Sequence, residues 1–302
     1  MSGRLNSTAS IRSAYLVAML LVLSTAFPVS TPAAAEAAVS PQGIASAASS
    51  QATAVPGGIY RLPLPDGVDR AYFQGKPVMV HRGKAIVGVA IDTVPGDYEV
   101  EFSDSGTTTR QTFRVVAKAY PEQRITIENQ RMVDPLQEDL ERIRDERRRQ
   151  LEKYDLFTDR ALDLVPFAKP VEGATSSPFG RRRILNGQPR SPHSGLDIVA
   201  VTGTPIMAPA PGRVVLTGDL FFNGKTVFLD HGQGLVTMYC HMNGIDVSEG
   251  DEVMRGEVIG QVGATGRVTG AHLHWSVSLN GNRVDPTMVM EAFNGSSPGG
   301  SG

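Results

Sequence analysis

The chain has 302 residues, enough for about two domains. Its 29 basic and 31 acidic residues give a net charge of −2, which excludes the strongly basic surface of a typical nucleic-acid-binding protein and a polybasic membrane patch. With 41% apolar and 20% charged residues the chain can bury hydrophobic cores, and its one cysteine, Cys240, excludes an intrachain disulfide and a thiolate zinc cluster.

Residues 1–38 have the pattern of a secretory signal peptide. Arg4 and Arg12 precede the apolar run Ala14–Phe27, and the small-residue tract Pro32–Ala38 follows it. The run is shorter than the roughly 20 apolar residues of a membrane-spanning helix. We therefore expect cleavage near Ala35 and export, with the periplasm as the expected compartment, the cell exterior as a second one, and an uncleaved anchor as the alternative.

Residues 39–55 are rich in Ser, Ala, Gln and Gly and are predicted to form a flexible linker. Residues 56–118 then alternate short apolar runs with turn signals, and we expect strands at Val78–Val80, Ala85–Ile91 and Tyr98–Phe102. This spacing is typical of a small sandwich, so the segment is predicted to be an immunoglobulin-like β module.

Residues 119–165 are predicted to be a charged helical linker. Apolar residues recur there at spacings of three and four, which favours a solvated connecting helix over a coiled coil. Residues 166–290 return to short strands rich in β-branched and aromatic residues, with no helix of useful length expected, and residues 291–302 are predicted to be a flexible tail. The predicted fold class is thus mainly β.

Two pairs of polar residues in the C-terminal region have the spacing of metal ligands. His193 and Asp197 are four residues apart, too far on an extended strand to share an ion, so the backbone must bend at Ser194–Gly195. His272 and His274 share one face of a strand, while Leu273 and Trp275 would bury on the other.

These side chains match the needs of a hydrolytic zinc. Such a metal takes three nitrogen or oxygen ligands from the protein and leaves one position for water. His193, Asp197 and one histidine of the His272/His274 pair satisfy that count. The remaining histidine, together with His241, would then move protons or stabilise an oxyanion.

The sequence resembles peptidase family M23, the lysostaphin-type or LytM-type peptidases, over roughly 173–286. The resemblance rests on motifs that occur in the family's order: Ser177–Arg181, His193–Asp197, Ala208–Gly212, Asp230–Gly234, Tyr239–Met242, Gly260–Gly266, His272–His274 and Val284–Pro286.

By this resemblance, His193, Asp197 and His274 are the ligands of one Zn²⁺ per chain, and His241 and His272 are the catalytic pair. It also implies a two-layer antiparallel β fold for the C-terminal domain. The implied activity is a zinc metalloendopeptidase that cuts peptide cross-links or stem peptides of bacterial peptidoglycan, expected as a monomer with no nucleic-acid partner. A regulatory protein is a possible further partner.

Two other functions remain open from sequence. One is a non-catalytic regulator or wall-binding protein that keeps the M23 fold, in the manner of an amidase activator. Family members of that kind commonly lack several ligand or catalytic residues, all of which are present here. The other is a secreted protease that cuts proteins or pentaglycine bridges.

Three further features are assigned structural roles. His231 is predicted to shape a turn, and Cys240 is predicted to be buried. Because adjacent strand residues point to opposite faces, Cys240 and His241 are not expected to form a thiol dyad. The run Arg181–Arg183 is predicted to be a solvated turn, with contact to substrate carboxylates as the alternative.

Overall fold

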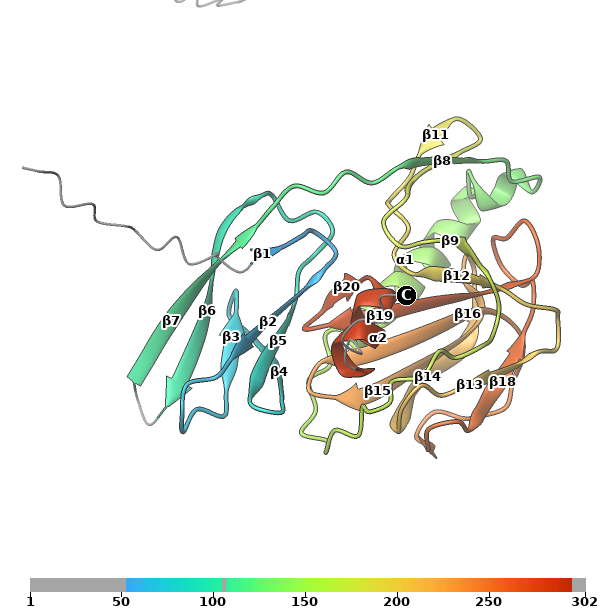
Figure 1. The fold of residues 1–302 in the computed structure, drawn as a ribbon. Coiled ribbons are helices and arrows are strands. Elements are labelled where there is room, and N and C mark those ends of the chain that lie inside the picture. The colour runs from blue at the N-terminus through green and yellow to red at the C-terminus, as the bar shows by residue number, and fades with distance from the viewer. Residues whose placement is uncertain (1–52, 105–106, 295–302) are drawn as a thin grey trace, which may run out of the picture. The chain divides into compact units, whose positions relative to one another are not determined.

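The computed structural model describes residues 53–104 and 107–294, and these are mostly β-structure, as the sequence predicts (Figure 1). The predicted signal peptide and nearly all of the predicted linker lie outside the described residues. Among the helices of the described part, none has the length and apolar character needed to cross a membrane.

The first module is one continuous seven-stranded sheet in the order β1-β7-β6-β3-β4-β5-β2. Its core contains stacked aromatic rings, with the ring centroids of Tyr60 and Phe113 4.1 Å apart. The immunoglobulin-like assignment of this module stays a prediction. The strands are β1 (Thr53–Ala54), β2 (Ile59–Pro63), β3 (Ala71–Phe73), β4 (Lys76–His81), β5 (Lys84–Gly88), β6 (Gly96–Asp104) and β7 (Thr107–Val115).

The connecting segment contains the predicted charged helix, α1 (Leu140–Tyr154), after two short 3-10 turns, η1 (Gln130–Met132) and η2 (Gln137–Asp139). Before them lies β8 (Glu122–Ile125), which pairs in parallel with β10 (Arg182–Leu185) of the C-terminal region. Only part of the predicted apolar stripe packs: Tyr154 is buried, whereas Leu136, which precedes the helix, and Leu151 are 50% and 44% exposed. The helix also buries the charged residue Glu146.

The C-terminal domain is built on a ten-stranded, largely antiparallel sheet. Along the main path the order is β17-β14-β15-β16-β19-β12-β9, with β13, β18 and β20 attached at its side. The remaining strands are β9 (Thr175–Ser177), β11 (Gln188–Pro189), β12 (Leu196–Val199), β13 (Pro205–Met207), β14 (Gly212–Leu220), β15 (Gly224–Gly232), β16 (Leu235–Ile245), β17 (Glu252–Val253), β18 (Val258–Val262), β19 (His272–Leu279) and β20 (Asn282–Val284).

Both faces of the central strands are buried, because alternate side chains enter different cores. On β15, Val227 and Leu229 belong to the main core, whereas Phe228 belongs to a second core beside α1. On β16, Tyr239 and Cys240 divide between the two cores in the same way. This two-sided burial explains the nearly continuous apolar runs of these strands.

One helix in this domain was not expected from the sequence. Pro286–Asn294 forms α2, which buries Pro286, Val289 and Phe293. Nine residues with one proline are a weak helical signal in isolation, but proline is favoured in the first turn of a helix. The predicted absence of a helix after Pro166 was therefore wrong, and α2 extends to Asn294, into the segment predicted as a flexible tail.

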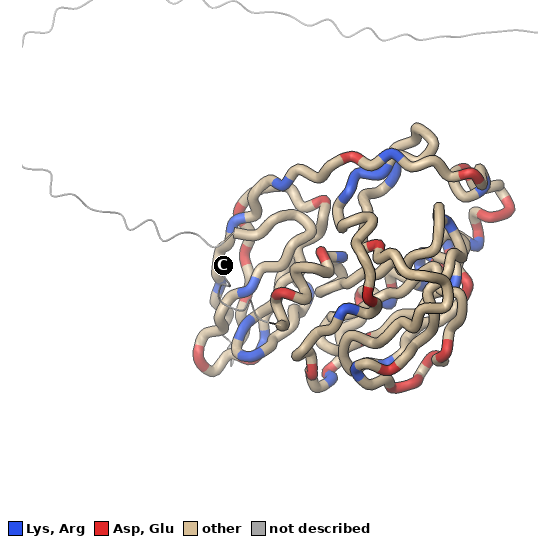
Figure 2. The backbone as a smooth tube through the Cα atoms, turned by 45° about the vertical axis from the view of Figure 1, so that its right-hand side comes forward, with Lys and Arg blue, Asp and Glu red and all other residues tan. Residues whose placement is uncertain are grey.

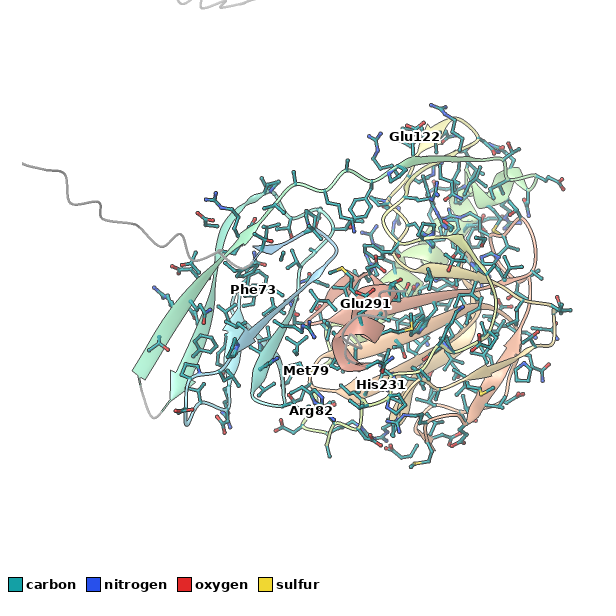
Figure 3. The ribbon with its side chains drawn as sticks, in the orientation of Figure 1. Phe73, Met79, Arg82, Glu122, His231 and Glu291 are labelled. Carbon is teal, nitrogen blue, oxygen red and sulfur yellow. The ribbon has the colours of Figure 1, made fainter. Side chains whose placement is uncertain are left out.

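The first module packs on the C-terminal domain through a buried hydrogen-bond pair. The side-chain amide of Asn280 accepts from the Gly88 N–H at 2.6 Å and donates to the Gly88 carbonyl at 3.1 Å. Met79 of β4, labelled in Figure 3, lies in the main core of the C-terminal domain. The two parts thus share one core rather than meeting at a polar surface.

Removing the Asn280 side chain should destabilise the protein. We expect Asn280→Gly, which tolerates the backbone φ of 44° at this position, to lower the free energy of unfolding by about 2–3 kcal/mol, because both polar groups of Gly88 lose a partner. Urea unfolding measures this change. Asn282→Ala is the control. It should lower the free energy of unfolding by less, because it removes only a second donor to the Gly88 carbonyl.

Candidate metal centre

Two neighbouring antiparallel strands bring a carboxylate and an imidazole face to face. Asp197 of β12 lies directly opposite His274 of β19 in the strand register. On β19, Leu273 and Trp275 point into the main core, which leaves His272 and His274 on the other face. The strand geometry expected for this pair of histidines is therefore present.

His193 reaches the same place because the chain bends at Gly195 just before β12. A Cβ atom at this glycine would lie 2.5 Å from the carbonyl oxygen of Trp275 and 2.7 Å from Cε1 of His274. Only glycine allows the backbone to approach β19 this closely. The bend expected between His193 and Asp197 is thus present.

Three ligand-type atoms from these residues form a small triangle. His193 Nε2 lies 2.9 Å from Asp197 Oδ1 and 3.0 Å from His274 Nδ1, and His274 Nδ1 lies 2.7 Å from Asp197 Oδ1. All three residues are buried. The cluster could therefore hold a metal ion.

The surrounding acceptors indicate which nitrogen of each ring carries its proton. His193 Nδ1 lies 2.9 Å from the carbonyl oxygen of Pro178, which can only accept, so the proton is on Nδ1 and Nε2 is free. The hydroxyl of Ser276 donates to the Ser194 carbonyl, and so it accepts from His274 Nε2 at 2.9 Å. In His274 the unprotonated nitrogen is therefore Nδ1.

The triangle thus consists of three acceptors, and only a cation or an additional proton can hold them together. Burial lowers the pKa of His274 to about 4, which disfavours the additional proton at neutral pH. Two neutral imidazoles and one carboxylate are a donor set that suits a divalent transition metal.

The second oxygen of Asp197 is occupied by an arginine. Arg183 of β10 donates to Asp197 Oδ2 at 2.8 Å, and only 21% of its side chain is exposed. The prediction of a solvated turn is therefore wrong for Arg183, because the pairing of β10 with β8 folds this segment over the site. The contact leaves Oδ1 as the carboxylate atom that faces the two imidazoles.

His241 reaches this face through an irregularity in β16. Regular alternation would place it with Tyr239, on the face opposite to Cys240, and Cys240 is paired with His274. The backbone at His241 has φ of 62°, and the pairing of β16 with β15 shifts register around it. Such bulges re-aim side chains next to functional sites.

As a result, His241 and His272 face each other beside the triangle. Their ring centroids are 5.0 Å apart, and that of His241 is 6.0 Å from that of His274. Each ring has Nδ1 on a backbone carbonyl, Thr265 for His241 and Gly270 for His272, which leaves Nε2 free. His272 Nε2 lies 3.9 Å from Asp197 Oδ1.

Cys240 and His231 take no part in this cluster. His241 lies on the same face as Cys240, so the expected opposite-face geometry is wrong for this pair. Burial nevertheless raises the pKa of the Cys240 thiol to about 12, so the thiol stays protonated at neutral pH and is not a nucleophile. His231, labelled in Figure 3, is buried at the end of β15, where its nitrogens contact the Pro211 carbonyl and the Thr237 hydroxyl at 2.8 Å each. It is a structural histidine in a strand rather than in a turn.

Comparison with known proteins places this site in a family. The model of peptidase family M23 matches residues 191–286, which include all five clustered side chains. A crystal structure of a chain assigned to peptidase M23 from Pseudomonas aeruginosa is 43% identical, with a TM-score of 0.67, and the match covers 79% of this chain and 96% of that one. The chain belongs to peptidase family M23.

Named relatives match this M23 chain over shorter segments. The DD-carboxypeptidase/endopeptidase Mpg of Neisseria meningitidis serogroup B is 41% identical over 114 residues, or 38% of this chain. The peptidoglycan DD-endopeptidase ShyC of Vibrio cholerae is 40% identical over 116 residues, also 38% of this chain. These matches span only 26% and 27% of the relatives' own lengths.

Sequence reasoning missed two residues that orient the M23 site, Arg183 and Ser276. Ser276 continues the period-two face of His272 and His274, so the same strand pattern could have identified it. Arg183 has no comparable signal, because its contact with Asp197 depends on the pairing of β10 with the distant β8.

We expect the methyl group of Gly195→Ala to push His274 away from Asp197. Metal affinity should fall by more than about tenfold, in the range seen when ligand orientation is disturbed. Equilibrium titration with zinc and a competing chelator measures the change. Gly270→Ala is the matched control near His272, since a Cβ there meets nothing within 4 Å, and equal affinities in the two variants would contradict the argument.

Burial of His231 predicts a pH-dependent stability. Desolvation lowers its pKa from 6.5 to about 4, so the unfolded state binds an extra proton between these values. Stability is therefore fully present above about pH 6.5 and is lost as the pH falls toward 4, by about 3 kcal/mol from this group. Unfolding of His231→Gln between pH 7 and 4 should show a shallower pH dependence than the wild type.

Proposed function

We propose that the chain is a zinc-dependent endopeptidase that hydrolyses peptide cross-links or stem peptides of bacterial peptidoglycan. The observation that carries this proposal is the triangle of three unprotonated acceptors beside two further imidazoles with free Nε2 atoms. The substrate class comes from the relative in Vibrio cholerae, the peptidoglycan DD-endopeptidase ShyC.

The donor set fits one zinc ion per chain, held by His193, Asp197 and His274. A tetrahedral zinc with bonds of about 2.0–2.1 Å separates its ligand atoms by about 3.3 Å, so separations of 2.7–3.0 Å need only a small opening. When bound, zinc polarises a carbonyl and makes water a better nucleophile at neutral pH. The backbone carbonyl of Pro178 and the hydroxyl of Ser276 fix the ring orientations.

His241 and His272 supply proton transfer in this proposal. Burial, followed by the nearby His274 and His272, holds the pKa of His241 well below its usual range, so the ring is neutral at pH 7. Its free Nε2 can accept a proton from the attacking water. The free Nε2 of His272 is the second proton-transfer group: it would first accept a proton released by the attacking water and then donate it to the oxyanion or the departing amine.

The proposed substrate lies outside the cytoplasm, so this function requires export, with the periplasm as the proposed compartment. The segment predicted to direct it, 1–38, lies outside the described residues. We further propose that the protein acts as a monomer. The alternative of a non-catalytic regulator is less well supported, because all five ligand and proton-transfer side chains are present and gathered at one place.

Three substitutions separate metal binding from turnover. His193→Ala and Asp197→Ala should lose both zinc and activity, because each removes one of three ligands. His241→Ala should keep zinc but lower kcat by about 10²–10⁴-fold, the range for a general base or acid. Metal content is measured by mass spectrometry of the purified protein, and activity by identifying the products of digested peptidoglycan.

The control for these variants is His81→Gln in the first module, which should retain both zinc and activity. Bound zinc and full cleavage in all three site variants would contradict the assignment. Stoichiometric zinc without cleavage in the wild type would favour the non-catalytic regulator.

A further inference from the structure

A cavity of about 550 Å³ adjoins the metal centre and contacts three of its histidines, His193, His241 and His274. Five arginines line it, and among the described residues no aspartate or glutamate does. These are Arg147, Arg183, Arg190, Arg267 and Arg283. Over the rest of the described chain, acidic and basic residues are interspersed (Figure 2), so the concentration of positive charge around this cavity is a local feature.

The arginines come from five separate segments of the chain. They lie on α1, on β10, after β11, before β19 and on β20. Like charges that converge in a partly buried space repel one another more strongly than they would in water. Such an arrangement is stabilised when an anion enters it.

Two of the five arginines already have an anionic neighbour. Arg183 is bonded to Asp197, and Arg190 lies 3.5 Å from the carboxylate of Asp134. For Arg147, Arg267 and Arg283, no carboxylate of the described residues comes within 4.0 Å. Their positive charge is therefore uncompensated by ion pairing within this part of the protein.

Arg267 is the arginine best placed to bind an anion. Its guanidinium lies 4.5 Å from the ring centroid of Phe222, which fixes its plane, and it donates one long hydrogen bond of 3.4 Å to the Met132 carbonyl. Burial, and then Arg183 and Arg190, lower its pKa to about 10, so it remains charged at neutral pH.

Arg267 also lies where two cavities meet at the metal centre. A second cavity, of about 160 Å³, borders Asp197 and His272 and shares Arg183, His241 and Arg267 with the first. A group bound to Arg267 would therefore sit beside the candidate proton-transfer residues. This placement is that of a substrate subsite rather than of a remote anion site.

We propose that the arginine-lined cavity is a carboxylate-binding subsite, in which Arg267 binds a free carboxylate of the peptide substrate next to the bond that is cleaved. The proposal rests on the endopeptidase function proposed above and narrows its substrate class. A planar guanidinium pairs with a carboxylate through two parallel hydrogen bonds. Stem peptides with acidic residues offer such a group, whereas a glycine bridge offers no side-chain carboxylate.

The test compares two substrates and three variants in the full zinc-loaded chain. The substrates are a cross-linked stem peptide with free carboxylates and the same peptide with those carboxylates converted to amides. The variants are Arg267→Gln, Arg267→Lys and, as the control, Arg144→Gln, whose arginine is exposed on α1 and does not line the cavity. Hydrolysis gives kcat and KM, and calorimetry gives the affinity for the cleavage products, which need no turnover.

We expect the wild type to prefer the carboxylate form by at least about tenfold in kcat/KM and in product affinity, the effect of a hydrogen-bonded charge. Arg267→Gln should abolish this preference mainly through KM, Arg267→Lys should restore part of it, and Arg144→Gln should behave as the wild type. Circular dichroism and zinc content establish that each variant is folded.

The outcomes distinguish this proposal from the one on which it rests. Cleavage of both substrates at equal rates, with equal product affinities, would overturn the carboxylate subsite and leave the endopeptidase in place. A product preference that disappears in Arg267→Gln, without cleavage of either substrate, would support the subsite and overturn the endopeptidase. If Arg267→Gln affected both substrates equally, Arg267 would be a structural residue and the subsite proposal would fail.

Discussion

The constraint on which the site depends is the mutual proximity of three electron-pair donors. Asp197 Oδ1, His193 Nε2 and His274 Nδ1 lie within 3.0 Å of one another, and the nearby carbonyl and hydroxyl groups keep the protons on the far sides of both rings. Without a cation such an arrangement is repulsive, because a buried acceptor has no water to compensate it. The rest of the domain must therefore hold these groups in place against their repulsion.

The sheet provides that rigidity. Asp197 and His274 are direct partners across β12 and β19, and Trp275, next to His274, is fully buried in the main core. The main core continues into the first module, and β16, the strand of His241, packs against a core on each face. A close-packed, two-sided sheet deforms little, which suits a site that needs fixed ligand positions.

The connecting segment contributes electrostatics as well as connectivity. By pairing with β10, β8 holds Arg183 against Asp197, and its Gln123 accepts a hydrogen bond from Ser177 beside His193. The carboxylate of the site thus has a positive neighbour on one side and room for a cation on the other. The same segment contributes Arg147 of α1 to the adjoining cavity, and the pairing of β8 with β10 brings Arg183 to it, so the connecting segment helps to shape both the candidate metal centre and the positively charged cavity beside it.

Periodicity and local spacing allowed the sequence by itself to determine the mainly β fold, the charged helix, the shared face of His272 and His274, and the need for a bend between His193 and Asp197. These are short-range properties, because strand alternation and the freedom of glycine act over a few residues. Only the tertiary structure decided the orientation of His241, which depends on a positive φ at a strand irregularity, and the helix α2, which packing stabilises. It also decided the position of Arg183 and the convergence of five arginines, because those contacts join segments that are distant in sequence and leave no local pattern to recognise.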